Sequence, residues 1–405
     1  MANCIVAQSG GPTAVINSSV VGLLRANNEI KAFDKVYAGL NGIEGILNGN
    51  IIDLSSFSED EINEFRYTPS SGLGSCRYKM KHLEESTEEY DKLLDILKCN
   101  DIKAFFYVGG NDSMDTIAKL GKYAKKTGLD INFIGIPKTI DNDLMFTDHT
   151  PGFGSAAKFI STTALETYLD SSVYINNGIF ILETMGRDTG WLAASACMAR
   201  INGEPIADFI YLPEVAFDIE KFLTDVRQKF EEKNKVFIVV SEGLRNSEGK
   251  FITEVKSQAH DKFGHAQLGG VGAYLKNLII NSSITNRVKS LELGVLQRCA
   301  MHCASNIDLQ EALEVGYSAL KFALEGNSGY MVAIKRESNS PYKTSYFLVE
   351  ANKIANNVKY FPTELINEEG NNIKEEALEY FLPLISGSPS LVIDNHLPKF
   401  KTISK

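Results

Sequence analysis

The sequence has no apolar run long enough to form a transmembrane helix. Its longest apolar stretches, such as Gly178–Leu182, are far shorter than the roughly 20 residues that a membrane span needs. The first residues, MANCIVAQSG, already have the pattern of a strand and not that of a signal peptide. These absences argue against a membrane protein and predict a soluble, unprocessed chain.

Basic residues are also too few to give the chain a positive surface. The 405 residues include 41 Lys and Arg against 51 Asp and Glu, which gives a net charge of −10 at pH 7. Nucleic acids and anionic membranes need a basic face, so the sequence predicts neither as a partner. An anionic small substrate would have to be met by a local cluster of basic residues.

Cysteines are few, and their spacing forms no disulfide framework. The six of them lie among apolar neighbours, which is typical of reduced thiols and predicts a cytoplasmic location. Cys299, His302 and Cys303 lie close together and would be a beginning for a zinc site. No second Cys/His pair completes four ligands, and the alternative interpretation of this stretch is the start of a helix.

What the sequence does contain is an alternation of strand and helix patterns, without repeats or low-complexity tracts. Its length of 405 residues allows two or three domains. The alternation favours a doubly wound α/β architecture. The expected strands include residues 4–8, 104–108, 131–137, 178–182, 206–212, 236–240 and 330–334. The expected helices include residues 16–25, 114 onward, a charged helix ending at 98, a helix that follows Ala157 and ends at about 170, 189–201 and 309–324. The glycine-punctuated stretch 36–49 is expected to be a loop system.

Three of these strands end in polar, glycine-bearing loops. The strand at 131–137 runs into PKTIDND (137–143), that at 104–108 into GGNDS (109–113), and that at 4–8 into SGGPT (9–13). Ligands of open parallel sheets bind outside the carboxyl ends of the strands, so these loops are expected to share one rim. Glycine, lysine and carboxylates together predict phosphate chemistry there.

Three later strands end in loops of different composition: ETMGR (183–187), PE (213–214) and SEG (241–243). Methionine, arginine and glutamate at a second rim are what a sugar-recognising face would use. An arginine at the end of the small-residue loop 68–77 suits anion binding, because its planar fork meets phosphate oxygens in pairs. A surface salt bridge is the alternative for Arg77.

The stretch Gly152–Ala157 has the form G-x-G-x-x-A of a dinucleotide-binding turn. It does not follow a strand directly, and no acidic residue ends a second strand at the usual spacing, which argues against nicotinamide binding. A helix N-terminus that favours an anion is what remains.

Taken together, these motifs resemble the phosphofructokinase family from Cys4 to about Lys335. The motifs that carry the resemblance are SGGPTAVIN (9–17), GSCR (74–77), GGNDS (109–113), PKTIDND (137–143), TPGFGSA (150–156), ETMGR (183–187), SEG (241–243) and LGVLQR (293–298). Any one of them is a weak signal, whereas eight in the family's order make accidental similarity improbable.

The resemblance implies two doubly wound three-layer α/β domains that face each other across a cleft. The donor domain would comprise residues 1–149 and about 298–350, and the acceptor domain residues 150–297 and about 351–405. It also implies Mg²⁺ as the cofactor and a homodimer or homotetramer as the assembly.

Two positions bear on the phosphoryl donor. Where ATP-using members of the family carry glycines, this sequence has Asp112 and Lys138, a pair that the family associates with pyrophosphate. A carboxylate at Asp112 would repel the α-phosphate of ATP, and Lys138 would supply positive charge to the transferred phosphate. The implied reaction is reversible phosphoryl transfer from pyrophosphate to the 1-hydroxyl of fructose 6-phosphate, a step of glycolysis and gluconeogenesis.

The resemblance also assigns roles to individual residues. Asp141 would be the general base, assisted by Lys138, Thr139 and Arg187. The donor would be bound by Gly10, Gly11, Arg77, Gly110, Asp112, Ser113 and Lys138; the sugar phosphate by Thr139, Asp141, Met185, Gly186, Arg187, Glu242, Lys289 and Arg298; and the metal by Asn111, Asp112 and Asp143. Arg287 is a near alternative to Lys289.

Three residues depart from the family pattern. Asn111 replaces an aspartate associated with Mg²⁺, Gly178 replaces an arginine that ATP-using members bring from a neighbouring chain, and Val295 replaces a histidine near the 6-phosphate. Four other functions stay open at this point: an ATP-dependent 6-phosphofructokinase, a pyrophosphate-dependent sedoheptulose 7-phosphate kinase, a non-catalytic regulatory subunit, and the oxidoreductase suggested by Gly152–Ala157.

Overall fold

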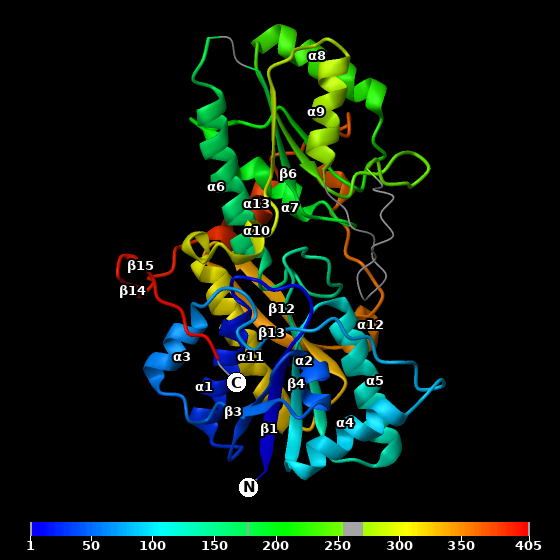
Figure 1. Cartoon of the computed structure of the whole chain (residues 1–405), viewed down its shortest axis with the longest axis vertical. Coiled ribbons are helices and arrows are strands. Elements are labelled where there is room, and N and C mark those ends of the chain that lie inside the picture. The colour runs from blue at the N-terminus through cyan, green and yellow to red at the C-terminus, as the bar shows by residue number, and fades with distance from the viewer. Residues whose placement is uncertain (1, 176–177, 254–269, 404–405) are drawn as a thin grey trace.

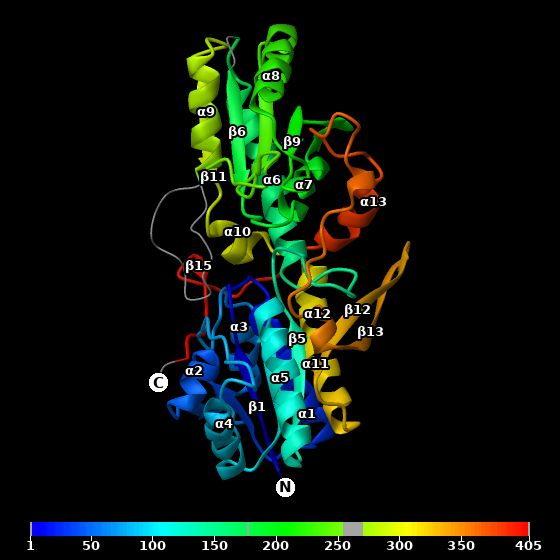
Figure 2. The same cartoon turned by 90° about the vertical axis from the view of Figure 1, so that its right-hand side faces the viewer.

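Two separate β-sheets organise the chain into two bodies stacked along its long axis (Figure 1). The structure is a computed structural model that describes residues 2–175, 178–253 and 270–403. The view in Figure 2, turned by 90°, shows the same two bodies with a narrow waist between them, and both chain ends lie on the first body.

The first body contains a seven-stranded sheet in the order β13-β12-β5-β4-β1-β2-β3. Its strands are β1 (Asn3–Gln8), β2 (Val36–Gly39), β3 (Ile51–Asp53), β4 (Ile102–Gly109), β5 (Asn132–Pro137), β12 (Tyr330–Asn339) and β13 (Tyr342–Glu350). The neighbours β2-β1-β4-β5 are parallel, so the loops that follow β1, β4 and β5 emerge at one rim.

Helices cover both faces of this sheet, because its central strands are apolar on both sides. Along β1, Cys4 and Val6 face α1 (Ile16–Ile30), α3 (Glu59–Arg66) and α11 (Asn306–Leu324). Ile5 and Ala7 face the other way, toward α2 (Gly42–Leu47), α4 (Glu88–Cys99) and α5 (Asn111–Thr127). The first body therefore has three layers.

The second body contains a four-stranded parallel sheet in the order β11-β6-β10-β9. Its strands are β6 (Ile179–Thr184), β9 (Phe209–Tyr211), β10 (Val236–Ser241) and β11 (Val288–Glu292). One face packs on α6 (Phe153–Ser171), α7 (Trp191–Ser195) and α13 (Ala377–Phe381), and the other on α8 (Ile219–Lys233) and α9 (Val271–Asn281). The remaining short elements are α10 (Leu296–Cys299), α12 (Ala351–Ile354), the two-residue pairs β7–β8 (200–201 and 204–205) and β14–β15 (393–394 and 397–398), and four 3₁₀ turns (196–198, 301–303, 363–365 and 382–385).

The C-terminal tail is shared between the two bodies. Residues 361–385 contribute Phe361 and Phe381 to the core of the second body. The tail then returns to the first body, where Lys401 bonds Glu61 at 2.6 Å and the backbone N–H of Lys401 donates to Thr68. The predicted placement of the whole segment 351–405 on the acceptor domain is therefore wrong, whereas the other domain boundaries stay a prediction.

Two local predictions were also wrong. Residues 36–49 form β2 and α2 and not a loop, because Ile43 and Ile46 give the short helix a fully buried face that the frequent glycines conceal. The helix expected over 189–201 stops at Ser195, where a 3₁₀ turn follows, because Arg200–Ile201 pairs as a strand with Glu204–Pro205.

No helix among the described residues is long and apolar enough to cross a membrane. All six cysteines are free thiols. Cys299 donates to the carbonyl of Val295 and Cys303 to the hydroxyl of Thr162, so the two thiols are directed to different partners.

A buried histidine just after the 137–143 loop joins that loop to α11 of the first body. The ring of His149 lies 2.8 Å from Asp148 through Nδ1 and 2.5 Å from Glu311 through Nε2. Burial alone would lower its pKa, but the two carboxylates outweigh burial and raise the pKa of His149 to about 9. The folded state therefore holds this imidazole in its charged form at neutral pH.

This charge makes the stability of the chain depend on pH in a defined direction. Because the folded pKa of His149 lies above its ordinary value of 6.5, its contribution is complete below pH 6.5 and is lost as the pH rises toward 9. We expect His149→Gln to lower the free energy of unfolding by roughly 2–4 kcal/mol at pH 6.5. This gap in unfolding free energy between the variant and the parent chain should close by pH 9.5. Urea unfolding at both pH values measures the gap, with exposed His82→Gln as the control. A gap that stays constant would contradict the charged histidine.

Candidate active site

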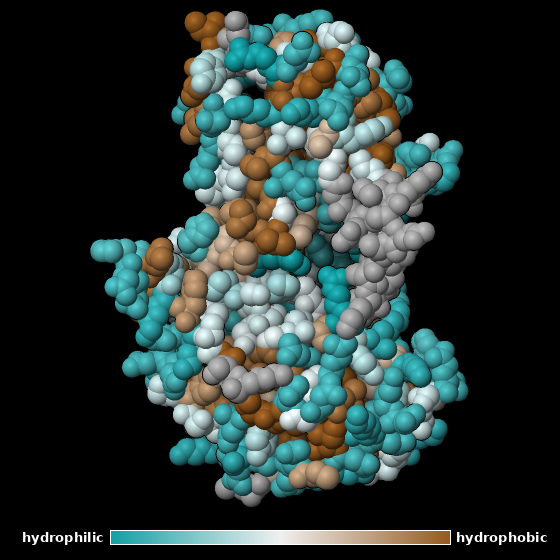
Figure 3. Space-filling model, in the orientation of Figure 1, coloured by the Kyte–Doolittle hydropathy of each residue, from teal (hydrophilic) through white to brown (hydrophobic). Residues whose placement is uncertain are grey.

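A pocket of about 810 Å³ lies where the carboxyl ends of the two sheets face each other. The first body supplies the loops after β1, β4 and β5, and the second body supplies the loops after β6 and β10. On the face seen in Figure 3, pale and teal residues gather along the waist between the bodies, whereas apolar residues gather directly above it.

Most of the residues predicted from the sequence line this one pocket. They are Gly10, Gly11, Arg77, Gly110, Asn111, Asp112, Ser113, Lys138, Thr139, Asp141, Asp143, Met185, Arg187, Glu242 and Arg298. Two predicted residues, Gly186 and Lys289, do not line it.

The structure does not bring Lys289 to this pocket, and its role in binding the sugar phosphate stays a prediction. Lys289 is the second residue of β11, and its register partner is Phe180 near the start of β6, so it lies away from the carboxyl ends where the pocket opens. Its side chain is exposed, 3.8 Å from Asp170. Gly186 lies behind the pocket wall, where its left-handed φ of 129° and its bonds to Ser241 and Glu242 set the turn between Met185 and Arg187.

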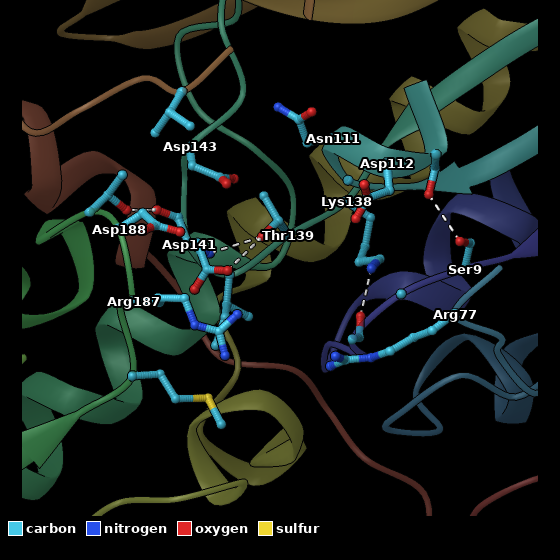
Figure 4. Close-up of a pocket in the computed structure, with 18 of the residues that line it drawn as sticks. Ser9, Arg77, Asn111, Asp112, Lys138, Thr139, Asp141, Asp143, Arg187 and Asp188 are labelled. Carbon is cyan, nitrogen blue, oxygen red and sulfur yellow. Dashed lines mark hydrogen bonds between the residues drawn. The ribbon is translucent and has the colours of Figure 1, made fainter. Parts of the chain in front are cut away.

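Glycines let the loops of the first body approach one another closely. A Cβ on Gly109 would lie 1.9 Å from the hydroxyl of Ser113, which itself contacts the hydroxyl of Ser9 at 3.0 Å. Lys138 reaches across to the loop after β1 and donates to the carbonyl of Gly11 at 2.5 Å (Figure 4). The two loops are thus joined through a lysine ammonium inside the pocket.

Basic groups gather at this end of the pocket. One terminal nitrogen of Arg298 would lie 3.3 Å from a Cβ on Gly11, and Arg77 is close enough to influence the pKa of Lys138. The Nε of Arg298 is buried and has no hydrogen-bond partner among the described residues. An anion bound here would supply that missing acceptor. These basic groups form the local cluster that an acidic protein needs in order to bind an anionic substrate.

The loop after β5 is arranged around Asp141. The backbone N–H of Asp141 donates to the hydroxyl of Thr139 at 3.1 Å, and this hydroxyl donates to the Asp141 carboxylate at 3.4 Å. Figure 4 shows Arg187 from the second body beside Asp141. Asp141 and Thr139 of the first body are thus brought together with Arg187 of the second body.

Burial gives the carboxylates of the pocket unusual proton affinities. The pKa of Asp141 is raised by desolvation, which Lys138, Thr139 and Arg187 oppose in part. Burial and the charge of Asp141 raise the pKa of Asp143. The same two causes raise the pKa of Glu242 to about 7. Burial also lowers the pKa of Lys138 to about 8, against the attraction of Asp141. Groups with such shifts are candidates for proton transfer.

The predicted metal ligands differ in how freely their oxygens can bind a cation. The amide of Asn111 already donates to the carbonyls of Ile354 and Asn357 and accepts from the N–H of Asn356 at 2.6 Å. Asp112 and Asp143 line the pocket with carboxylate oxygens. No group of three or more His, Cys, Asp or Glu in residues 2–175, 178–253 and 270–403 could hold a metal ion by itself. A pair of carboxylates suits Mg²⁺, which takes one or two of them and completes its shell with water and phosphate oxygens.

The N-terminus of α6, where G-x-G-x-x-A begins, is already occupied by an anion of the chain itself. Asp308 accepts from the backbone N–H of Gly152 at 2.8 Å and from that of Ser155 at 2.9 Å. Its carboxylate is 99% buried. The anion that this helix end favours is thus a carboxylate of the chain itself, and a dinucleotide pyrophosphate has no place there.

Five residues of the pocket lie outside the motifs found in the sequence: Lys79, Asp188, Thr189, Asn356 and Val358. Asp188 directly follows the ETMGR motif and pairs with Arg245 at 2.7 Å, and Lys79 lies two residues after Arg77, so both could have been found by extending motifs. Asn356 and Val358 come from the tail. No local pattern marks them, because only the path of the chain brings them to the pocket.

Comparison with known proteins identifies the family to which this arrangement belongs. The family model described as phosphofructokinase matches residues 3–323. The chain belongs to the phosphofructokinase family. Two curated relatives, from Halomonas elongata and Xanthomonas campestris, are each 40% identical over 407 and 404 residues and are named pyrophosphate–fructose 6-phosphate 1-phosphotransferase; the alignments cover 100% and 99% of this chain and 96% of each relative.

A solved structure shares the fold over nearly the whole chain. The pyrophosphate-dependent phosphofructokinase from Nitrosospira multiformis superposes with a TM-score of 0.88 at 36% identity, covering 98% of this chain and 95% of that one. The predicted fold class, doubly wound α/β of the phosphofructokinase type, is confirmed.

Two departures from the phosphofructokinase pattern have structural explanations. A Cβ on Gly178 would lie 2.1 Å from the carbonyl oxygen of Arg287, because β11 passes directly beside it, so no arginine can stand at this position. Val295 is 57% exposed and does not line the pocket.

Proposed function

We propose that this phosphofructokinase transfers a phosphoryl group reversibly from pyrophosphate to the 1-hydroxyl of D-fructose 6-phosphate, forming fructose 1,6-bisphosphate and phosphate. The observation that carries this proposal is that Asp112 and Lys138 line the same end of the pocket as Gly11, Arg77 and Arg298. The names of the relatives with 40% identity support it.

Donor choice follows from charge and space. Asp112 lies in the first turn of α5, where a helix N-terminus would otherwise attract the phosphate chain of a nucleotide. Its carboxylate repels a third phosphate, whereas a diphosphate is short enough to remain beside Lys138 and Arg77. The ammonium of Lys138 lies where charge spreads over the oxygens of the transferred group.

Asp141 is the general base of the proposed reaction. Its raised pKa makes the carboxylate a better proton acceptor, while Lys138 and Arg187 keep enough of it ionised. The carboxylate takes the proton of the 1-hydroxyl as that oxygen bonds to phosphorus, and the bond from phosphorus to the bridging oxygen of pyrophosphate breaks. Thr139 holds the base in place through its two hydrogen bonds.

Mg²⁺ is the proposed cofactor, and Asp112 and Asp143 would hold it. Bound Mg²⁺ neutralises charge on the phosphate oxygens of the donor. Asn111 is the least suitable of the three predicted ligands, since its oxygen already accepts a backbone N–H.

The second body supplies the proposed sugar site. Met185 packs at the pocket wall, Glu242 offers a carboxylate to a sugar hydroxyl, and Arg187 and Arg298 offer guanidinium groups to phosphate. Sedoheptulose 7-phosphate would present the same groups on a longer chain, so it remains the alternative acceptor. A regulatory subunit would not need the base, and Asp141 together with Lys138 argues against that alternative.

The proposed function is tested by offering pyrophosphate and ATP in parallel to the purified chain with Mg²⁺ and fructose 6-phosphate. We expect fructose 1,6-bisphosphate from pyrophosphate alone. Asp141→Asn should lower kcat by about 10² to 10⁴-fold, since it removes the base, while the KM values change little. Activity with ATP alone would contradict the donor assignment, and binding of fructose 6-phosphate without turnover would favour the regulatory subunit.

A double variant tests the donor argument separately. We expect Asp112→Gly combined with Lys138→Gly to let ATP support the reaction and to weaken the use of pyrophosphate. Asp115→Gly is the control, because it also puts a glycine into α5 but does not line the pocket. If pyrophosphate activity persists unchanged and ATP use stays absent, the proposed role of this pair is wrong.

We also propose a cytoplasmic homodimer or homotetramer. Leu291, Val295 and Leu296 form an exposed apolar group on the edge strand β11 and on α10, with 37%, 57% and 57% of their surface exposed. Burying such a group against a second copy is favourable. We expect Leu296→Asp to shift sedimentation toward a single chain, and exposed Leu324→Asp to leave it unchanged. A parent chain that sediments at 44.7 kDa would contradict the assembly, and recovery of the chain outside the cytoplasmic fraction of cells would contradict the location.

A further inference from the structure

The tail passes directly over the active site between α12 and the core of the second body. We name residues 354–359 the strap. Asn356 and Val358 of the strap line the pocket, on the side formed by Asn111, Asp112 and Asp143. None of the motifs that carry the family resemblance includes the strap, so its position over the pocket calls for an explanation of its own.

Asn111 fastens the first end of the strap to the loop after β4. Its side-chain amide donates to the carbonyl of Ile354 at 3.1 Å and to that of Asn357 at 2.6 Å, and its oxygen accepts from the N–H of Asn356 at 2.6 Å. An aspartate, as other members of the family carry, could not donate these two bonds. The departure at Asn111 is therefore explained by the strap.

Lys359 fastens the other end of the strap to the loop after β5. Its backbone N–H donates to the carbonyl of Asp143 at 2.8 Å. Its ammonium donates to the carbonyls of Asp148 at 2.8 Å and Thr147 at 3.2 Å, and lies 3.5 Å from the side-chain oxygen of Asn142. Every one of these oxygens belongs to the turn that follows the proposed base.

The second body holds Lys359 from the opposite side. The indole N–H of Trp191 donates to the carbonyl of Lys359 at 2.9 Å, and the ammonium lies 5.1 Å from the centre of that ring. The turn itself needs such support, because Asn142 adopts a left-handed φ of 56° and its side chain also bonds the N–H of Thr150 at 3.0 Å.

We propose that Lys359 is a positioning residue of the phosphoryl transfer, and that the strap fixes the distance between the donor loop (residues 110–113) and the base loop (residues 138–143). The strap bonds each loop near one of the two proposed Mg²⁺ ligands, which are Asp112 in the donor loop and Asp143 in the base loop. This inference rests on the proposed function. A displacement of about 1 Å between reacting groups costs on the order of 10²-fold in rate, so a device that sets this distance acts on kcat.

Lys359→Met tests the proposal, because methionine keeps the length of the side chain but donates no hydrogen bond. We expect kcat with pyrophosphate to fall about 10 to 100-fold, with both KM values within about threefold of the parent, since the binding groups stay in place. Lys353→Met on α12 is the matched control: the side chain of Lys353 is exposed and pairs with Glu350, and the variant should leave kcat unchanged. A loss confined to thermal stability, or a KM increase at constant kcat, would overturn the positioning role.

A double-mutant cycle with Asn111→Ala tests the strap as a link. If both residues act through the strap, either single substitution already releases it. The kcat of the double variant should then be little lower than that of the slower single variant. Rate losses that multiply would mean that the two residues act independently, and would overturn the link.

The failure of this inference can be told apart from failure of the proposed function. A parent chain that is inactive with pyrophosphate contradicts the function alone. Hydrogen exchange then tests whether the strap holds the base loop, and this measurement does not need an active enzyme. Lys359→Met should speed the exchange of backbone amides in residues 138–150, and Lys353→Met should not. Equal exchange in the two variants would overturn the strap's role.

Discussion

The pocket depends on holding three carboxylates and a lysine close together and partly withdrawn from water. Asp141, Asp143 and Glu242 each have a raised pKa because burial penalises their charged forms, and Asp141 adds to the penalty of the other two. Lys138 and Arg187 offset part of that cost. Without these cations the carboxylates would bind protons, and they could then neither accept a proton nor bind a cation.

This charge balance requires two bodies. Lys138 and the two aspartates come from the first sheet, whereas Arg187 and Glu242 follow strands of the second. A single sheet presents its loops along one rim, so it cannot surround a substrate with opposing groups. Two sheets with facing carboxyl ends can, and the hydrogen bond from Trp191 of the second body to the strap links them.

The sequence was sufficient to predict what lies directly after a buried strand. The loops 9–13, 109–113 and 137–143 share one rim, as predicted, because apolar runs locate strand ends and parallel strands bring those ends together. The loop 183–187 lies at the second predicted rim, on the other sheet, and lines the same pocket. The sequence was not sufficient for Lys289, whose position depends on where β11 starts relative to β6, nor for Asn356 and Val358, which the tail delivers from more than 200 residues away. The glycines of 36–49 concealed a helix, since composition does not reveal which face is buried.

The carboxylate of Asp308 at the start of α6 has a consequence for how the chain handles small anions. A reaction that releases inorganic phosphate beside a second open helix end would let its own product lodge there and slow each turnover. By filling that helix end with a side chain from α11, bonded to two backbone N–H groups, the fold removes this competing anion site. Phosphate groups are then left to the basic side chains of the pocket, Arg77, Lys138 and Arg298.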